Sequence, residues 1–345
     1  MNTIIQRLQP HTVEIYHLTE GQIEEKLVDA RSLLIPSRFD LFAKVYYIRM
    51  REENRVEAER VYKEHIKAFN PDLKEPGRDD KSGYDDFVAS FNQLIDVFKN
   101  QEFDSSKSLV PVTEDGVILD GAHRIAALAY YDKKVGIAQC KGIKPKADFD
   151  YLYFKSRGLS WDTMDVITNE MVHWVPNMYV ACLWPKMKDK TDAHALIGQQ
   201  FGTVYEKTLH VNLTSFRALI RRVYEGQPWV NEPDSVNNKS MLCYGFNGLI
   251  QFLFFVADNL EEVLIVKEKI RDMYDVGKHS LHITDSVEET RAIAEYILDE
   301  QKREVWLPVS AVDEFSNKLK ERWYYFKHVQ LINVKVTIAK VLKHK

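Results

Sequence analysis

The apolar positions of the first 145 residues fall into three stretches with helical spacing. The first begins after Pro36 and Ser37, which are common at helix starts, and runs to residue 68, so it predicts one long helix or two shorter ones. A second helix is predicted for 84–100, where five large apolar side chains share one face. Those side chains are Phe87, Phe91, Leu94, Ile95 and Phe98. The third stretch, 122–131, predicts a shorter helix.

Short apolar runs on either side of the third helix predict strands. Residues 108–121 are interpreted as two strands joined by a turn at Glu114-Asp115-Gly116, because Asp-Gly is a strong hairpin signal. Residues 135–143 predict a further strand. The resulting order of helix, strand, strand, helix and strand is that of an α+β or α/β unit that closes near residue 145.

Polar segments separate these patterned stretches. Residues 144–150 form a polar bridge with a proline, and a boundary placed there gives two domains, 1–145 and 146–345. The segments 70–86 and 226–240 predict two long loops. A loop of this length inside a compact domain is more often functional than idle.

Helical and strand-like patterns alternate again beyond residue 150. Helices are predicted at 160–172, 191–201, 213–225, 259–275 and 286–301. Strands are predicted at 178–183, 203–211, 242–256 and 279–284. The chain as a whole is therefore predicted to have an α+β (mixed α/β) fold, with a second mixed α/β domain after the first.

Length and composition describe an ordinary globular protein. A chain of 345 residues exceeds the usual size of one hydrophobic core, so two domains are the default expectation. Hydrophobic residues make up 45% and charged residues 28% of the chain, which excludes a disordered or fibrous protein. The net charge of -4 gives no overall reason to expect a nucleic-acid partner.

The cysteines and the N-terminus bear on the compartment. Cys140, Cys182 and Cys243 are widely spaced in apolar surroundings, which favours reduced core residues over a zinc site or disulfides. The N-terminus lacks the pattern of a signal peptide, and no apolar run approaches the ~18 residues of a membrane span. We therefore expect a cytoplasmic protein, attached at most to a membrane surface.

The most concentrated candidate chemistry lies in residues 116–126, "GVILDGAHRIA". The N-terminus of the helix after Gly121 offers backbone N–H groups and a positive dipole end, which together bind anions and phosphate in particular. Gly121 allows close approach of a ligand to the backbone, while His123 and Arg124 add side-chain donors. Capping by Asp120 and a surface ion pair of Arg124 would be a purely structural explanation. That explanation does not account for the four residue types together, so phosphate binding is favoured.

The stretch "ILDGAHRIAAL" resembles the signature of the ParB/sulfiredoxin-like superfamily, in which a strand, an Asp-Gly-x-His-Arg stretch and a helix follow one another. The resemblance covers residues 87–142 and implies a ParB/sulfiredoxin-like fold for the first domain. It also implies that His123 and Arg124 contact nucleotide phosphates. Sulfiredoxins carry a Cys where this chain has Ala122, so sulfinic-acid reduction is excluded. The helix-turn-helix module of the partition proteins has no match here.

A phosphotransferase also needs a base near the acceptor hydroxyl and acidic groups for Mg²⁺. We expect Asp120 to serve as base or metal-linked group, with His123 as the second catalytic residue. The predicted phosphate-binding residues are Gly121, Ala122, His123, Arg124 and Lys81. The loop around Lys81 adds further charges, namely Glu75, Arg78, Asp79 and Asp80. A solvated charge run is the favoured interpretation of this loop.

Arg38, Asp40 and Lys44 form a second group of charges, in which Asp40 and Lys44 have the spacing of one helix face. A surface i,i+4 pair is the favoured interpretation of this group.

Residues 275–298 hold a further set of polar residues. Lys278, Ser280 and His282 are predicted to bind substrate along a strand edge, with structure alone as an equal alternative. A zinc site is disfavoured, since His279 and His282 would face opposite sides of that strand. "PNMYVACLWP", "VYEKTLHVNLTSFRALIRRVYEGQPW" and "GKHSLHITDSVEET" are similar to the second domain of proteins found with surface-polysaccharide genes.

The last 28 residues, from Lys318, contain eight Lys or Arg against one Glu, with several aromatic residues among them. This pattern suits an anionic membrane surface or a nucleic acid. A C-terminal helix that docks on the core is slightly favoured, because apolar residues keep helical spacing. Those residues are Leu331, Val334, Ile338 and Val341.

These observations lead to one expected function and one alternative. The expected function is an ATP- or ADP-dependent phosphotransferase (kinase) that uses Mg²⁺ and acts on a hydroxyl of a sugar, polyol or other small acceptor, with surface-polysaccharide biosynthesis as the setting. The alternative is a nucleotide-binding switch, a nucleic-acid-binding protein or a nuclease of the ParB type. The acidic remainder of the chain counts against a nucleic-acid partner.

Overall fold

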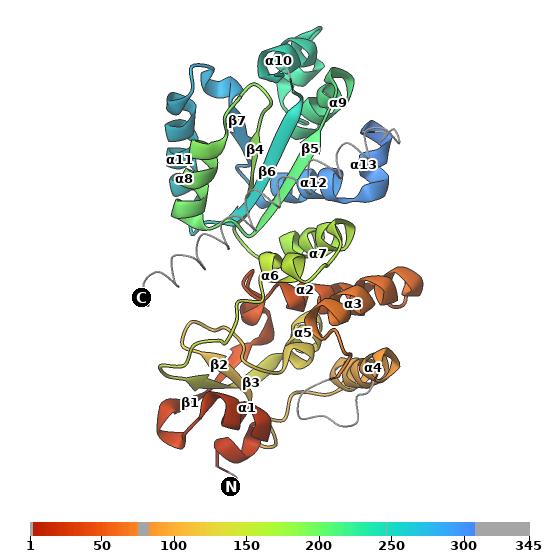
Figure 1. Cartoon of the computed structure of the whole chain (residues 1–345), viewed down its shortest axis with the longest axis vertical. Coiled ribbons are helices and arrows are strands. Elements are labelled where there is room, and N and C mark those ends of the chain that lie inside the picture. The colour runs from red at the N-terminus through yellow and green to blue at the C-terminus, as the bar shows by residue number, and fades with distance from the viewer. Residues whose placement is uncertain (1–2, 75–82, 246, 308–345) are drawn as a thin grey trace, which may run out of the picture.

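The computed structural model describes residues 3–74, 83–245 and 247–307. It contains two β-sheets, one in each half of the chain, with helices around and between them (Figure 1). The predicted α+β class is confirmed. All three cysteines are buried and none forms a disulfide, as their apolar surroundings predicted.

The first half contains five α-helices and three strands among the described residues. The helices are α1 (Pro10–Tyr16), α2 (Phe39–Met50), α3 (Arg55–Phe69), α4 (Tyr84–Asn100) and α5 (Ala122–Tyr130). The strands are β1 (Ile23–Asp29), β2 (Val110–Thr113) and β3 (Lys134–Cys140). The first helical stretch is therefore two helices, and Asn54 caps the second by accepting a hydrogen bond from the backbone N–H of Glu57.

The first sheet has the strand order β1-β3-β2, with β1 antiparallel and β2 parallel to β3. Of the predicted strand pair at 108–121, only β2 is a strand, and its partner is reduced to an isolated bridge between Val112 and Ile118. The chain does reverse here as predicted, since the backbone N–H of Leu119 donates to the carbonyl of Pro111 at 2.8 Å. It leaves the pairing directly afterwards because Gly121 turns it into α5.

The second half contains a larger set of elements. Its α-helices are α6 (Tyr151–Ser156), α7 (Trp161–Trp174), α8 (Thr191–Phe201), α9 (Leu213–Val223), α10 (Ser235–Cys243), α11 (Leu260–Met273), α12 (Val287–Leu298) and α13 (Glu300–Trp306). Its strands are β4 (Met178–Leu183), β5 (Tyr205–His210), β6 (Leu249–Val256) and β7 (Leu281–Ile283). Short 3-10 helices of the chain are η1 (Ile5–Arg7), η2 (Glu20–Gln22), η3 (Ala30–Leu33), η4 (Pro228–Asn231) and η5 (Gly277–His279).

Several boundaries in this half differ from the prediction, and the helix predicted at 286–301 is two helices, α12 and α13. The segment 226–240 is not a continuous loop, because η4 and the start of α10 lie within it. The strand predicted from residue 242 begins only at Leu249, since 242 and 243 still belong to α10. The strand predicted at 279–284 is shorter, because residues 277–279 form η5.

The second sheet is antiparallel throughout, in the order β5-β6-β4-β7. This order and the helices α8 and α11 between its strands give the split β-α-β arrangement of ferredoxin-like sheets. Alternate residues of β4 serve opposite faces, as the period of two requires. Tyr179, Ala181 and Leu183 pack under α8 and α11. The residues between them join the main hydrophobic core with α7, α9 and α12.

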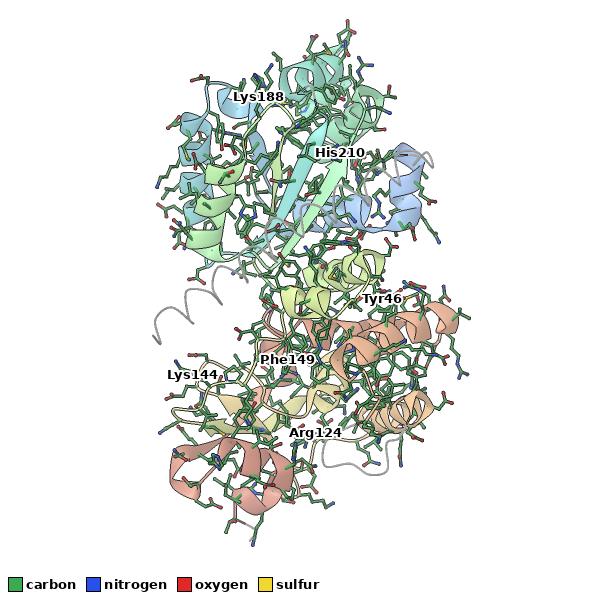
Figure 2. All side chains as sticks on the ribbon, viewed as in Figure 1. Tyr46, Arg124, Lys144, Phe149, Lys188 and His210 are labelled. Carbon is green, nitrogen blue, oxygen red and sulfur yellow. The ribbon has the colours of Figure 1, made fainter. Side chains whose placement is uncertain are left out.

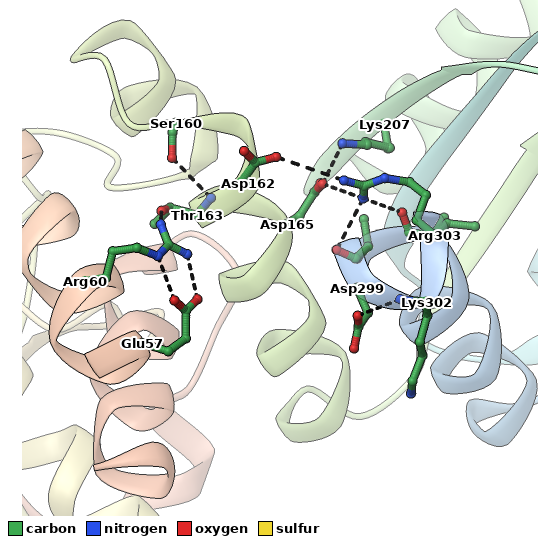
Figure 3. A network of polar contacts seen from close by, with 12 residues as sticks. Glu57, Arg60, Ser160, Asp162, Thr163, Asp165, Lys207, Asp299, Lys302 and Arg303 are labelled. Atoms are coloured by element: carbon green, nitrogen blue, oxygen red, sulfur yellow. Dashed lines mark hydrogen bonds and ion pairs between the residues drawn. The ribbon is translucent and has the colours of Figure 1, made fainter. Parts of the chain in front are cut away.

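Helix α7 links the two halves. It packs on α2 and α3 of the first half and on α12 of the second, so one hydrophobic cluster continues past the boundary predicted at 144–150. Buried polar contacts hold it as well (Figure 3). The carboxylate of Asp165 accepts a hydrogen bond from the ammonium of Lys207 at 2.5 Å, which Figure 3 shows. It also accepts one from the Tyr205 hydroxyl at 2.7 Å. The division into two domains stays a prediction.

Candidate functional site

The predicted phosphate-binding stretch lies at the N-terminus of α5. Gly121 immediately precedes the helix with a φ of 89°, a left-handed conformation that side chains other than glycine rarely adopt. A left-handed residue followed by right-handed ones turns successive backbone N–H groups toward one side, which is a common way to bind an anion. The backbone of 121–123 therefore has a conformation that suits an anion, and phosphate binding there stays a prediction.

Arg124 places its guanidinium beside this helix end. Its Nη1 donates to the Ser108 hydroxyl at 2.8 Å, and Nη2 lies 3.4 Å from a carboxylate oxygen of Asp120. The guanidinium also lies over Gly121, since a Cβ added there would be 2.8 Å from Nη2. The Arg124 side chain is 16% exposed and that of Asp120 is 33% exposed. A positive group is thus held next to the helix N-terminus, with its partner carboxylate partly open to solvent.

The His123 ring lies in a cluster of aromatic side chains. Its Nε2 is 2.8 Å from the Tyr62 hydroxyl, and its ring meets Phe91 edge-on at 4.7 Å. When Tyr62 donates its hydrogen to Nε2, the ring's own hydrogen sits on Nδ1. A phosphate contact by His123 would therefore be made by Nδ1.

The acidic groups available for a metal are few in the part of the chain that the structure describes. No group of three or more His, Cys, Asp or Glu side chains could hold a metal ion there. Asp120 is the one predicted metal ligand within this part. Lys81 and its acidic neighbours lie outside the described residues, so these predictions stay open. Since Mg²⁺ often binds through one or two carboxylates and the substrate phosphates, a single Asp120 is compatible with it.

Arg38, Asp40 and Lys44 are buried, so their interpretation as a surface pair is wrong. Arg38 grips Asp40 through two hydrogen bonds of 2.8 and 2.9 Å, and the Lys44 ammonium lies 2.9 Å from the same carboxylate. Burial alone would raise the pKa of Asp40, but the charges of Arg38 and Lys44 outweigh it and hold that pKa well below its ordinary value.

This buried group contacts the candidate site through the backbone. Arg38 Nη1 also donates to the carbonyl of Ile118, two residues before Asp120. The same guanidinium is fixed by Asp40, so the ion pair orients the chain that leads into Gly121. We therefore regard Arg38 and Asp40 as positioning residues for the start of α5.

The second group of predicted residues is only partly brought together. Lys278 and His282 line one cavity of about 870 Å³. Ser280 is buried and does not line that cavity, and its hydroxyl donates to the carbonyl of Gly277 at 2.7 Å. His282 is also buried, with Nε2 2.8 Å from a carboxylate oxygen of Glu289.

The two predicted groups lie in different halves of the molecule. Helix α5 packs on α2, α2 packs on α7, and α7 packs on α12, which covers the second sheet. Figure 2 shows the same separation, with Arg124 in the lower half and Lys188 and His210 in the upper one. The structure therefore does not bring Lys278 and His282 next to Asp120.

Sequence reasoning missed the partners that come from other elements. Ser108 precedes β2, and the reversal at residues 114–117 returns the chain beside it. Because the predicted strand pair at 108–121 brings its two ends together, it could have placed Ser108 near Arg124. Tyr62 and Phe91 come from α3 and α4, and no local signal pointed to them.

Comparison of the chain with protein-family models, with characterised proteins and with solved structures found no match. None of the helices within the described ranges is long and apolar enough to cross a membrane. The basic segment from Lys318 lies outside those ranges, so its docking on the core, a peripheral membrane contact, and the ParB-type alternative stay predictions.

Proposed function

We propose that this chain is an ATP- or ADP-dependent phosphotransferase whose nucleotide phosphates bind at the N-terminus of α5. The observation that supports this most directly is the left-handed Gly121 with the Arg124 guanidinium folded over it. Together they place backbone N–H groups and a fixed positive charge on one side of a helix end. Phosphate is the anion that such an arrangement recognises most often.

Each residue of the site would have its own role in phosphate binding or transfer. Backbone N–H groups of 121–123 and the Arg124 guanidinium hold phosphate oxygens, and Nδ1 of His123 donates to them. Mg²⁺ would neutralise charge on the phosphates, with Asp120 as its protein ligand or as the base that takes the proton of the acceptor hydroxyl. We expect the acceptor to be a sugar, polyol or other small hydroxyl compound, in line with the surface-polysaccharide setting predicted above.

The proposal is tested by binding and turnover measurements on the full chain. We expect ATP or ADP to raise the thermal midpoint and to bind in calorimetry more tightly with Mg²⁺ than without it. Phosphate transfer from radiolabelled ATP to a panel of sugars and polyols should then give a labelled product. Absence of binding by ATP, ADP, CTP and GTP would contradict the nucleotide site, and binding without transfer would contradict the enzyme.

Gly121→Ala is expected to weaken nucleotide binding, because the new methyl group would displace the Arg124 guanidinium. The left-handed backbone should add a stability loss of about 1–2 kcal/mol. Gly142→Ala is the matched control: its φ is 70°, yet a Cβ there meets nothing within 4 Å. Urea unfolding should show similar losses for both variants, whereas calorimetry with ATP should show weaker binding for Gly121→Ala alone. Equal affinity of the two variants would argue against the site.

A further inference from the structure

The cavity that Lys278 and His282 line is formed by elements of the second half of the chain, including α9, α10, α11 and α12, which lie away from α5 in Figure 1. It measures about 870 Å³ and is lined by residues from α9, α11, α12 and β7 and from the segment after α9. Its lining includes Tyr224 and Trp229, whose ring centroids are 5.2 Å apart. The His282 ring meets Tyr224 edge-on at 5.0 Å. The cavity thus combines flat aromatic surface with polar groups.

Most charged side chains around this cavity are paired with one another. These pairs are Arg222 with Glu225, Arg271 with Glu268, Lys267 with Asp285, and His282 with Glu289. Lys239 and Lys278 line the same cavity, and neither forms an ion pair with a carboxylate of the described residues. Glu288 also lines the cavity without an ion pair among the described residues, so the lining holds two lysines and one carboxylate outside these pairs.

Lys239 comes from α10 and Lys278 from η5; we call these two lysines the lysine cluster. The ammonium of Lys239 lies 3.4 Å from the backbone carbonyl of Lys278 and 5.3 Å from the centroid of the Tyr224 ring. Burial lowers the pKa of His279, and the charges of the lysine cluster lower it further. The positive charges of the lysine cluster repel one another, and a bound anion would relieve that repulsion.

We propose that the lysine cluster and the aromatic pair Tyr224 and Trp229 form a binding site for a phosphate monoester of a ring-containing small molecule, such as a sugar phosphate. Two ammonium groups that line one cavity suit the double negative charge and three acceptor oxygens of a phosphate monoester better than a single carboxylate. The aromatic pair offers a non-polar surface on which a ring can lie. This site does not depend on the nucleotide site at α5.

Calorimetry with simple probes tests the ligand class. Glucose 6-phosphate is expected to bind the full chain, uncharged glucose is expected not to bind, and inorganic phosphate should bind more weakly than the ester. Glucuronate, which has one negative charge on a similar ring, should bind at least tenfold more weakly than glucose 6-phosphate. No binding of glucose 6-phosphate at millimolar concentration, or equal affinity for glucuronate, would overturn the proposal.

A pair of substitutions tests the lysines. Lys239→Ala combined with Lys278→Ala should weaken binding of glucose 6-phosphate at least tenfold, the size expected for losing charge-assisted hydrogen bonds. Lys269→Ala combined with Lys302→Ala removes the same charge from the same half and should leave the affinity unchanged. Lys278→Glu, at an exposed position where folding is not at risk, should also abolish binding. Unchanged affinity in Lys278→Glu would rule out the site.

A last binding measurement distinguishes this site from the one at α5. Arg124→Ala should leave the affinity for glucose 6-phosphate unchanged, because the lysine cluster belongs to α10 and η5 in the other half of the chain. Loss of glucose 6-phosphate binding in Arg124→Ala would instead place the ester at α5 and overturn the proposal. Failure of ATP binding with retained glucose 6-phosphate binding would contradict the proposed nucleotide site alone.

Discussion

Replacing Asp40 with asparagine is expected to lower the free energy of unfolding by about 3–5 kcal/mol, the usual cost of removing one partner from a buried ion pair. The Asp40 side chain is fully buried between Arg38 and Lys44, and asparagine would remove the negative charge that both cations contact. Urea unfolding at neutral pH measures this loss. Asp96→Asn is a matched control: Asp96 pairs with Arg51 at 2.8 Å, but its side chain is 66% exposed. We expect a loss of less than ~1 kcal/mol there.

The same pair predicts how stability depends on pH. The folded pKa of Asp40 lies below its unfolded value of ~3.9. Its contribution is therefore fully present above that value and is lost as the pH falls below it toward the folded pKa. The stability difference between wild type and Asp40→Asn should accordingly shrink between about pH 5 and pH 2. A difference that stays constant over this range, or that is below ~1 kcal/mol at pH 7, would contradict the role given to Asp40.

Replacing Arg124 with alanine is expected to weaken nucleotide binding by about 10- to 100-fold, the loss that follows from removing charge-assisted hydrogen bonds to phosphate. The fold should survive, because Arg124 contacts Ser108 and Asp120 at a helix end that is partly open to solvent. Calorimetry with ATP and Mg²⁺ gives the affinity, and circular dichroism checks the fold.

Arg51→Ala controls for the loss of a half-buried arginine in the same half. Arg51 is 14% exposed against 16% for Arg124, and it is also paired with an aspartate. Its contacts are to Asn92 and Asp96 of α4, so its removal should cost stability without changing the affinity for ATP. Equal affinities of Arg124→Ala and wild type would remove the basis of the proposed nucleotide site.

The helices were predictable because their apolar faces repeat along several turns, as in α4, where Phe87, Phe91, Ile95 and Phe98 are all buried. Strand β1 was missed because it is an edge strand with mostly charged and exposed residues, so no apolar alternation marks it. Helix α10 was missed because its sequence is polar and few of its residues are buried. In both cases the partner elements, not the local sequence, stabilise the structure.

The candidate site was predictable only as far as it is contiguous. Residues 120–124 are adjacent in the sequence, so their residue types were visible there, and the helix start after Gly121 is a local feature. Tyr62 and Ser108 reach the same place only because α3 and the chain before β2 fold beside α5. The burial of Asp40 did have a signal: Phe39–Ile48 is apolar at most positions on every side, which indicates a helix enclosed by the core.

The position of α7 has a consequence for the chain as a whole. Its apolar residues pack against helices of both halves, so the hydrophobic cluster that the two halves share depends on it. If one half opens, α7 turns part of its buried surface toward water, and the other half loses packing at the same time. Unfolding of the two halves is therefore coupled through α7. An insertion or truncation near this helix would affect both halves.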